Sequence, residues 1–117
     1  CLLVGSKPRG HGMERSDLLK DNGKIFVSQG KAIAEYAADD CRIVVVGNPC
    51  NTNCMIAASQ SDRFDNSRFT AMTRLDQNRA VSMLAKKGNV VIEEVEGLAI
   101  FGNHSPTMFP DYSNALI

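Results

Sequence analysis

The stretch CRIVVVGNP, residues 41–49, decides the fold of this chain. Its centre, residues 43–46, is an uninterrupted aliphatic run, which is typical of a strand buried on both faces of a parallel sheet. Gly47 and Pro49 end the run, because glycine allows a close backbone turn and proline cannot continue a ladder of hydrogen bonds. The stretch therefore predicts a buried parallel strand followed by a turn that presents Asn48.

The segments on either side alternate between strand and helix patterns. Residues 2–4 and 98–101 are short apolar runs, and the longer segments between them carry apolar residues at helical spacing. This alternation predicts an α/β fold with a mainly parallel sheet. The expected elements are strands at 2–4, 41–46 and 98–101, helices at 14–38, 52–59 and 74–87, and a segment at 91–95 that suits either state. The apolar face of the first helix should consist of Leu18, Leu19, Ile25, Phe26, Ile33, Tyr36 and Ala37.

The composition is that of a globular domain with no electrostatic preference. The chain has 117 residues, 44% hydrophobic and 22% charged, and 13 basic residues balance 13 acidic ones. A net charge of zero offers no footprint for nucleic acid or for an anionic membrane surface. No apolar run approaches the roughly 20 residues that a membrane span needs. We therefore expect neither nucleic acid nor membrane among the partners.

The cysteines and the two chain ends give two further expectations. The spacings of Cys1, Cys41, Cys50 and Cys54 match neither a small disulfide framework nor a zinc motif, which favours buried, reduced thiols and no metal site. The chain starts directly in a strand-like pattern and stops at Ile117 without a polar tail. We expect it to be an internal segment of a longer protein.

Polar side chains that could carry chemistry stand beside the predicted elements. His104 follows an apolar strand and a glycine, where open α/β sheets place their ligands, and histidine can exchange a proton near neutral pH. Asp76 and Arg79 are three residues apart and share a helix face. Each feature also has a plain structural explanation. His104 could be a loop histidine bonded to backbone, and Asp76 and Arg79 could form a solvated ion pair. The segment at Asn48 could be an ordinary strand-to-helix turn.

The segment 7–15 is rich in glycine and basic residues. Arg9 and Arg15 flank Gly10 and Gly12. A glycine-containing loop suits a lid that excludes water, and the planar fork of arginine suits carboxylates. The alternative is an exposed basic turn.

Taken in order, these motifs resemble malate dehydrogenases of the cytosolic, bacterial and plastid branch of the lactate/malate dehydrogenase family. The resemblance covers essentially the whole chain. It is carried by GSKPR at 5–9, GMERSDLL at 12–19, VGNPCNTN at 46–53, RLDQNRA at 74–80 and GNHS at 102–105.

The resemblance implies a role for each matching residue. His104 would be the proton acceptor and Asp76 the carboxylate that orients it and stabilises its charged form. Arg79 would bind the carboxylate next to the reacting carbon. Arg9 would read the second carboxylate, and Arg15 would polarise the carbonyl. The remaining contacts would be made by Asn48 to substrate and the nicotinamide side, and by Asn22, Gln29, Val46 and Gly47 to the dinucleotide.

The resemblance also implies an architecture, a reaction and a setting. Residues 1–71 would be the C-terminal half of a Rossmann-type dinucleotide-binding domain, and residues 72–117 the start of the substrate domain. The reaction would be the reversible NAD-dependent oxidation of malate to oxaloacetate in the tricarboxylic acid cycle. The full-length protein would be a cytoplasmic or plastid homodimer.

The sequence departs from the family pattern at three points. The glycine-rich phosphate loop and the residue that separates NAD from NADP are absent from this stretch, so NADP stays open and the isolated 117 residues should be inactive. Phe101 stands where many relatives have tryptophan.

Two alternative functions stay open. One is a lactate-type 2-hydroxyacid dehydrogenase, which a neutral residue in place of Arg9 would suit. The other is a non-catalytic segment used for binding or assembly.

Overall fold

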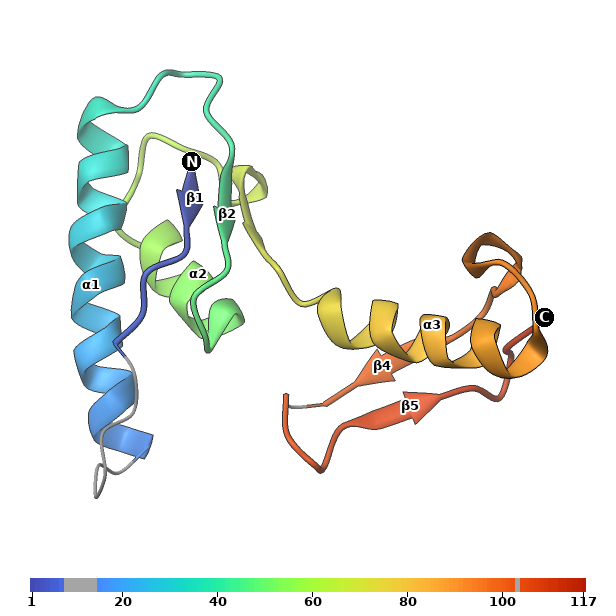
Figure 1. Cartoon of the computed structure of the whole chain (residues 1–117). Coiled ribbons are helices and arrows are strands. Elements are labelled where there is room, and N and C mark those ends of the chain that lie inside the picture. The colour runs from blue at the N-terminus through green and yellow to red at the C-terminus, as the bar shows by residue number, and fades with distance from the viewer. Residues whose placement is uncertain (8–14, 103) are drawn as a thin grey trace. The chain divides into compact units, whose positions relative to one another are not determined.

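A computed structural model describes the backbone of residues 1–7, 15–102 and 104–117, and the side chains of the same ranges except those of 15–19. The predicted loop residues 8–14, including Arg9, lie outside the described residues. The chain divides into two compact units, Cys1–Met72 and Thr73–Ile117, which Figure 1 shows in blue to yellow and in yellow to red.

The first unit contains a three-stranded sheet in the order β1-β2-β3, all parallel. The strands are β1 (Leu2–Leu3), β2 (Ile43–Val45) and β3 (Phe69–Ala71). Leu2 pairs with Val44, and Ile43 pairs with Phe69, so β2 lies in the middle. Ile43 and Val45 are fully buried, which explains why the stretch reads as an apolar run. The expected α/β class with parallel strands is confirmed.

Two helices, α1 (Arg15–Tyr36) and α2 (Cys50–Ala58), connect the three strands. They pack closely at Gly30, where a Cβ atom would lie only 2.5 Å from the carbonyl oxygen of Ala57. Glycine is therefore required there by the approach of the α2 backbone.

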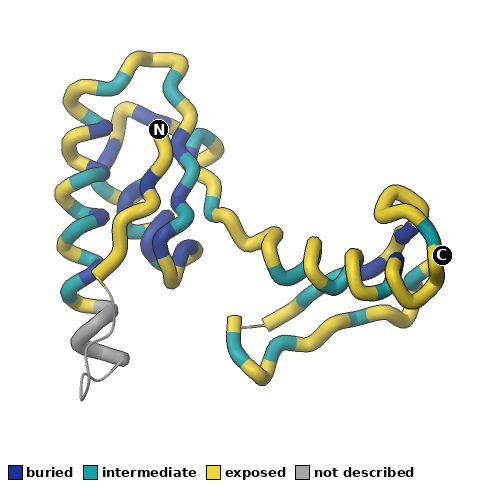
Figure 2. Tube along the Cα trace, in the orientation of Figure 1, coloured by how far each residue is buried: buried dark blue, intermediate teal, exposed yellow. Residues whose placement is uncertain are grey.

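The core of the first unit lies between these helices and the sheet, as the buried segments in Figure 2 show. Phe26 and Ile33 of the predicted apolar face are buried. Tyr36 is not: it is 77% exposed at the last position of α1, so its assignment to the core face was wrong. The buried core residues are Leu3, Phe26, Ile33, Ile43, Val45, Cys50, Cys54, Ala57, Phe64 and Phe69.

The second unit consists of helix α3 (Leu75–Gly88), the short 3₁₀ helix η2 (Ile92–Glu94) and a hairpin of β4 (Ala99–Phe101) and β5 (Phe109–Asp111). The hairpin is antiparallel, with Phe101 opposite Phe109. The strand expected at 98–101 is therefore not part of the parallel sheet.

The end of α3 also differs from expectation. The predicted helix ended at residue 87, whereas Gly88 is still helical and Asn89 adopts the left-handed conformation that closes the helix (φ 54°). Asparagine is the residue that best tolerates this conformation after glycine.

Two elements of the first unit were not predicted from the sequence. They are strand β3 and the 3₁₀ helix η1 (Asn66–Arg68) that precedes it. The thiols of Cys50 and Cys54 are buried, and burial together with the neighbouring Cys50 thiol raises the pKa of Cys54. Cys1 is exposed and Cys41 half-buried, so the prediction of buried thiols was wrong for this pair. Within the described ranges, no helix has the length and apolarity to cross a bilayer.

Candidate active site

Helix α3 carries two of the predicted residues on one face. Asp76 stands in its first turn, and Arg79 follows one turn later. The guanidinium Nη1 of Arg79 lies 3.5 Å from the carboxylate Oδ1 of Asp76, the upper limit for a hydrogen bond. The Asp76 side chain is 16% exposed and that of Arg79 is 62% exposed. The carboxylate is thus largely covered, while the arginine extends into solvent.

His104 stands in the loop that joins β4 to β5. The loop begins at Gly102, whose positive φ of 91° is a conformation that side chains of other residues rarely allow. After His104, a turn is closed by the Met108 amide, which donates to the Ser105 carbonyl at 3.0 Å, and by the Thr107 amide, which donates to the Ser105 hydroxyl at 3.2 Å. The hairpin therefore holds the segment that carries His104 from both sides.

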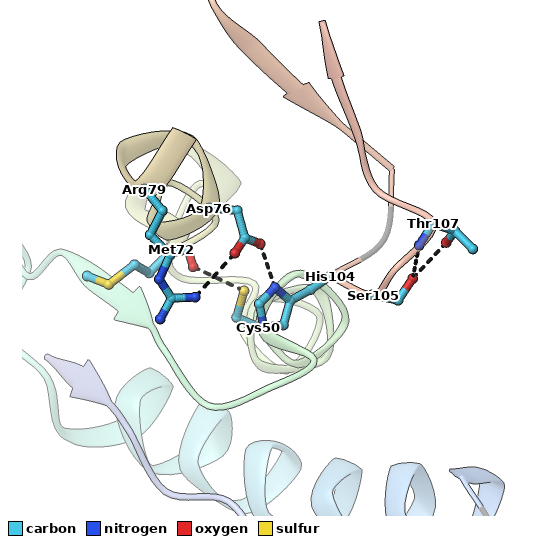
Figure 3. A network of polar contacts seen from close by, with 7 residues as sticks. All are labelled: Cys50, Met72, Asp76, Arg79, His104, Ser105 and Thr107. Atoms are coloured by element: carbon cyan, nitrogen blue, oxygen red, sulfur yellow. Dashed lines mark hydrogen bonds and ion pairs between the residues drawn. The ribbon is translucent and has the colours of Figure 1, made fainter. Parts of the chain in front are cut away.

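The imidazole of His104 contacts the carboxylate of Asp76 directly. Nδ1 of His104 lies 2.5 Å from Oδ2 of Asp76, as Figure 3 shows. An ionised carboxylate can only accept hydrogen bonds, so Nδ1 is the donor. This leaves Nε2 as the ring nitrogen that exchanges a proton: it accepts one in the neutral ring and donates one in the imidazolium. The arrangement suits general acid–base catalysis.

A side chain that the sequence analysis gave no role connects the two halves of this arrangement. The amide Nε2 of Gln77 donates to the backbone carbonyl of Leu98 at 3.0 Å. The bond joins the first turn of α3 to Leu98, the buried residue that precedes β4. Its neighbour Asp76 is therefore anchored relative to the hairpin that carries His104. The sequence held no signal for this bond, since polar residues on a helix face are common.

In the first unit, the turn at residues 47–49 follows the carboxyl end of β2. The amides of Val46 and Gly47 donate to the Leu3 carbonyl at 2.9 and 3.2 Å. A Cβ atom on Gly47 would lie 2.6 Å from the Gly5 carbonyl oxygen, so the two strand ends meet closely. Asn48 is exposed, while Val46 is half-buried. The turn thus presents the Asn48 side chain at the edge where parallel sheets bind ligands.

The turn is also held from helix α2. The side-chain amide of Asn53 donates from Nδ2 to the Gly47 carbonyl at 2.9 Å, and Asn53 is fully buried. Asn53 is the last residue of the motif at 46–53, and no role was predicted for it. A signal existed, because asparagine is unfavourable inside a helix unless its side chain has a partner.

The other predicted cofactor residues lie in α1. Asn22 is buried and its Oδ1 accepts from the Lys7 amide at 2.7 Å, while Nδ2 donates to the Lys7 carbonyl at 3.5 Å. Its amide therefore holds the chain after β1. Gln29 is half-buried with its Nε2 near Gly5, and its Oε1 has no partner among the described residues. Arg15 begins α1, and its side chain is outside the described set.

The structure thus brings three of the predicted residues together, Asp76, Arg79 and His104. It places Val46, Gly47 and Asn48 at one strand end of the other unit. Among the described residues, no group of histidine, cysteine and acidic side chains could hold a metal ion.

The three-stranded parallel sheet and the histidine–carboxylate pair lie in two units that each match a domain of one class of dehydrogenase. Residues 1–70 match the NAD binding domain of lactate/malate dehydrogenases, and residues 73–117 match the alpha/beta C-terminal domain of the same enzymes. The chain belongs to the lactate/malate dehydrogenase family.

Individual relatives agree with this assignment. The chain is 60% identical over all 117 residues to a malate dehydrogenase of Rubrobacter xylanophilus, of which it spans 36%. Its fold is similar to a malate dehydrogenase structure from Naegleria fowleri (TM-score 0.91, 44% identity, 99% of this chain and 36% of that chain). It is also similar to a Trichomonas vaginalis lactate dehydrogenase in complex with NADH and oxamate (TM-score 0.84, 35% identity, 97% of this chain and 34% of that chain). The chain therefore spans about a third of the length of its relatives.

Proposed function

We propose that the full-length enzyme that contains this chain is a malate dehydrogenase, which oxidises (S)-malate reversibly to oxaloacetate with NAD. The observation that carries the proposal is the 2.5 Å contact between His104 Nδ1 and Asp76 Oδ2, with Arg79 on the same helix face. The identity of 60% to a malate dehydrogenase over the whole chain supports the choice of substrate.

His104 exchanges the proton of the reacting hydroxyl group. In malate oxidation the neutral ring takes the hydroxyl proton at Nε2, and in oxaloacetate reduction the imidazolium returns it to the carbonyl oxygen. Asp76 keeps the Nδ1–H bonded in both states, so the ring holds one tautomer and one orientation. Its largely covered carboxylate offsets the positive charge that forms on the ring.

Arg79 binds the carboxylate next to the reacting carbon. Only one of its nitrogens approaches Asp76, and that contact is long, so the guanidinium keeps donors for a two-point contact with substrate. By their motif positions, Arg9 binds the distal carboxylate and Arg15 stabilises the charge that develops on the carbonyl oxygen.

The edge at the end of β2 suits the nicotinamide end of the cofactor. Gly47 has no side chain, Val46 is half-buried and Asn48 is exposed, so the edge offers flat backbone beside one hydrogen-bonding side chain. NAD held at this edge would supply the hydride acceptor for malate oxidation. Gln29, with an unpartnered Oε1, is proposed as a further contact, whereas Asn22 supports the cofactor edge by holding Lys7 in place.

A lactate-type dehydrogenase is the second candidate. It is favoured by the similarity to the lactate dehydrogenase in complex with NADH and oxamate, a structure at 35% identity. The two candidates differ in Arg9, because only a dicarboxylate offers a second negative charge for that arginine to bind.

A hybrid enzyme tests the proposal, in which these 117 residues replace the corresponding stretch of the Rubrobacter xylanophilus relative. All the proposed substrate-binding and catalytic residues then come from this chain. We expect NADH-dependent reduction of oxaloacetate at a much higher kcat/KM than that of pyruvate, and loss of both activities on His104→Ala. A folded hybrid that prefers pyruvate, or one whose turnover survives His104→Ala, would contradict it. We also propose that the full-length enzyme is a homodimer, which light scattering of that enzyme itself tests.

A further inference from the structure

We propose that Asn53 is a positioning residue that fixes the place of Asn48 in the site. The inference rests on the proposed function, since it assumes that Asn48 contacts substrate. Asn53 lies in helix α2, four residues after Pro49, and is completely buried. It therefore cannot touch the substrate itself and must act through the turn above it.

Hydrogen bonds hold both backbone polar groups of Gly47, the residue before Asn48. The Gly47 amide donates to the Leu3 carbonyl of β1, and the Gly47 carbonyl accepts from Asn53 Nδ2 at 2.9 Å. The Gly5 backbone and the Phe26 ring leave no space for displacement toward β1, because a single added carbon on Gly47 would lie 2.6 and 3.0 Å from them. Gly47 is thus held by β1, by the segment that follows β1, and by helices α1 and α2.

The residue after Asn48 is held by the same asparagine. The backbone amide of Asn53 donates to the Pro49 carbonyl at 2.9 Å. One residue therefore bonds to both neighbours of Asn48, through its side chain on one side and its backbone on the other. Asn48 itself is exposed, so the position of its backbone is defined by these bonds to the residues before and after it.

The second polar atom of the Asn53 side chain argues against a role in stability alone. Its Oδ1 is buried and has no hydrogen-bond partner among the described residues. An unsatisfied buried carbonyl is unfavourable, and leucine has the same branched shape, with somewhat larger volume, without this cost. The presence of asparagine here despite that cost fits a requirement for its Nδ2 donor at Gly47.

A double-mutant cycle in the hybrid enzyme tests this inference. We expect Asn53→Leu to lower kcat/KM for oxaloacetate by at least about tenfold, mainly through KM. In the Asn48→Ala background the same change should cost less than about twofold, because the residue through which it acts is gone. Equal losses in both backgrounds, or no loss in either, would overturn the proposal. The matched control is Asn66→Leu, at an exposed asparagine whose side chain makes no hydrogen bond among the described residues.

A second measurement decides the outcome if the substitution disturbs folding or if the enzyme has another substrate. Hydrogen exchange of the Gly47 amide is measured without any ligand, and Asn53→Ala is compared alongside Asn53→Leu. Exchange at least about tenfold faster in either folded variant supports the anchoring of the turn, and unchanged exchange in both overturns it. Failure of the unsubstituted hybrid to reduce oxaloacetate would instead count against the proposed function.

Discussion

Replacing Asp76 by asparagine separates the charge of this side chain from its shape. The carboxylate accepts from His104 Nδ1 at 2.5 Å, and its charge strengthens the bond. The Asp76 side chain is 16% exposed and that of His104 is 58% exposed, so only the carboxylate side of the bond is shielded from water. Asparagine fits the same space. It can accept weakly through its oxygen, or donate through its nitrogen and force the ring proton onto Nε2, where the histidine can no longer act as a base.

The size of the effect follows from the bond that is lost. Hydrogen bonds to charged groups contribute about 1.5–3 kcal/mol. At about 1.4 kcal/mol for each factor of ten, the loss corresponds to roughly a 10- to 140-fold decrease in kcat/KM if the bond stabilises the transition state. Folding should change less, because the asparagine oxygen can still accept weakly from the imidazole, and the position of Asp76 in the first turn of α3 contributes only about 0.3–1 kcal/mol through the helix dipole.

The assay follows the oxidation of NADH by oxaloacetate in the hybrid enzyme, with thermal unfolding recorded on the same preparations. Asp62→Asn is the matched control, because Asp62 is exposed and has no ion pair among the described residues. We expect the control to be silent and Asp76→Asn to lose at least about tenfold in kcat/KM with little change in Tm. A kcat/KM within about threefold of the unsubstituted hybrid would refute the role of the carboxylate.

Four further outcomes are expected in the same hybrid. Arg79→Lys keeps the charge but loses the planar fork, so KM for oxaloacetate should rise by at least about tenfold, and an unchanged KM would leave Arg79 as a surface ion pair. Arg9→Gln should lower the ratio of kcat/KM for oxaloacetate over pyruvate by at least about tenfold, and a constant ratio would remove Arg9 from substrate selection. Asn22→Ala deletes a buried side chain that bonds both backbone groups of Lys7, so urea unfolding should show a loss of about 1–3 kcal/mol. The 2.7 Å hydrogen-bonded ion pair with Lys7 lowers the pKa of Asp21 in the folded protein. The stabilisation from this pair is therefore complete above the unfolded pKa of about 3.9 and is lost as the pH falls through the lower folded pKa. The difference in stability between wild type and Asp21→Asn should accordingly vanish only in strong acid, which urea unfolding at a series of pH values measures.

The parts of the fold that were predictable are those whose burial leaves a pattern in the sequence. β2 is buried and central, and its aliphatic run indicated this directly. β3 was missed because its middle residue, Thr70, is exposed, so its three residues carry no apolar run. The antiparallel pairing of β4 was missed because its partner β5 contains Pro110 and Asp111, residues that are rare in strands.

The candidate site shows a similar division. The spacing of Asp76 and Arg79 indicated one helix face, since this relation is local. No spacing rule relates Asp76 to His104, which lies 28 positions further along the chain, and only the family resemblance associated them. The bonds of Gln77 and Asn53 to backbone carbonyls were not predicted, because any amide side chain can make such a bond and only the folded backbone selects the partner.

The contact between α1 and α2 has a consequence for engineering a more stable variant. Helix α1 contains two internal glycines, Gly23 and Gly30. Replacing a helical glycine by alanine ordinarily raises the free energy of unfolding by up to about 1 kcal/mol. At Gly23 the added methyl group would meet Ile56 at an ordinary 3.5 Å, so this site is open to the exchange. At Gly30 it would meet the Ala57 carbonyl at 2.5 Å, and the two helices would have to separate. A consensus or propensity-based redesign that treats both glycines alike would therefore cancel at Gly30 what it gains at Gly23.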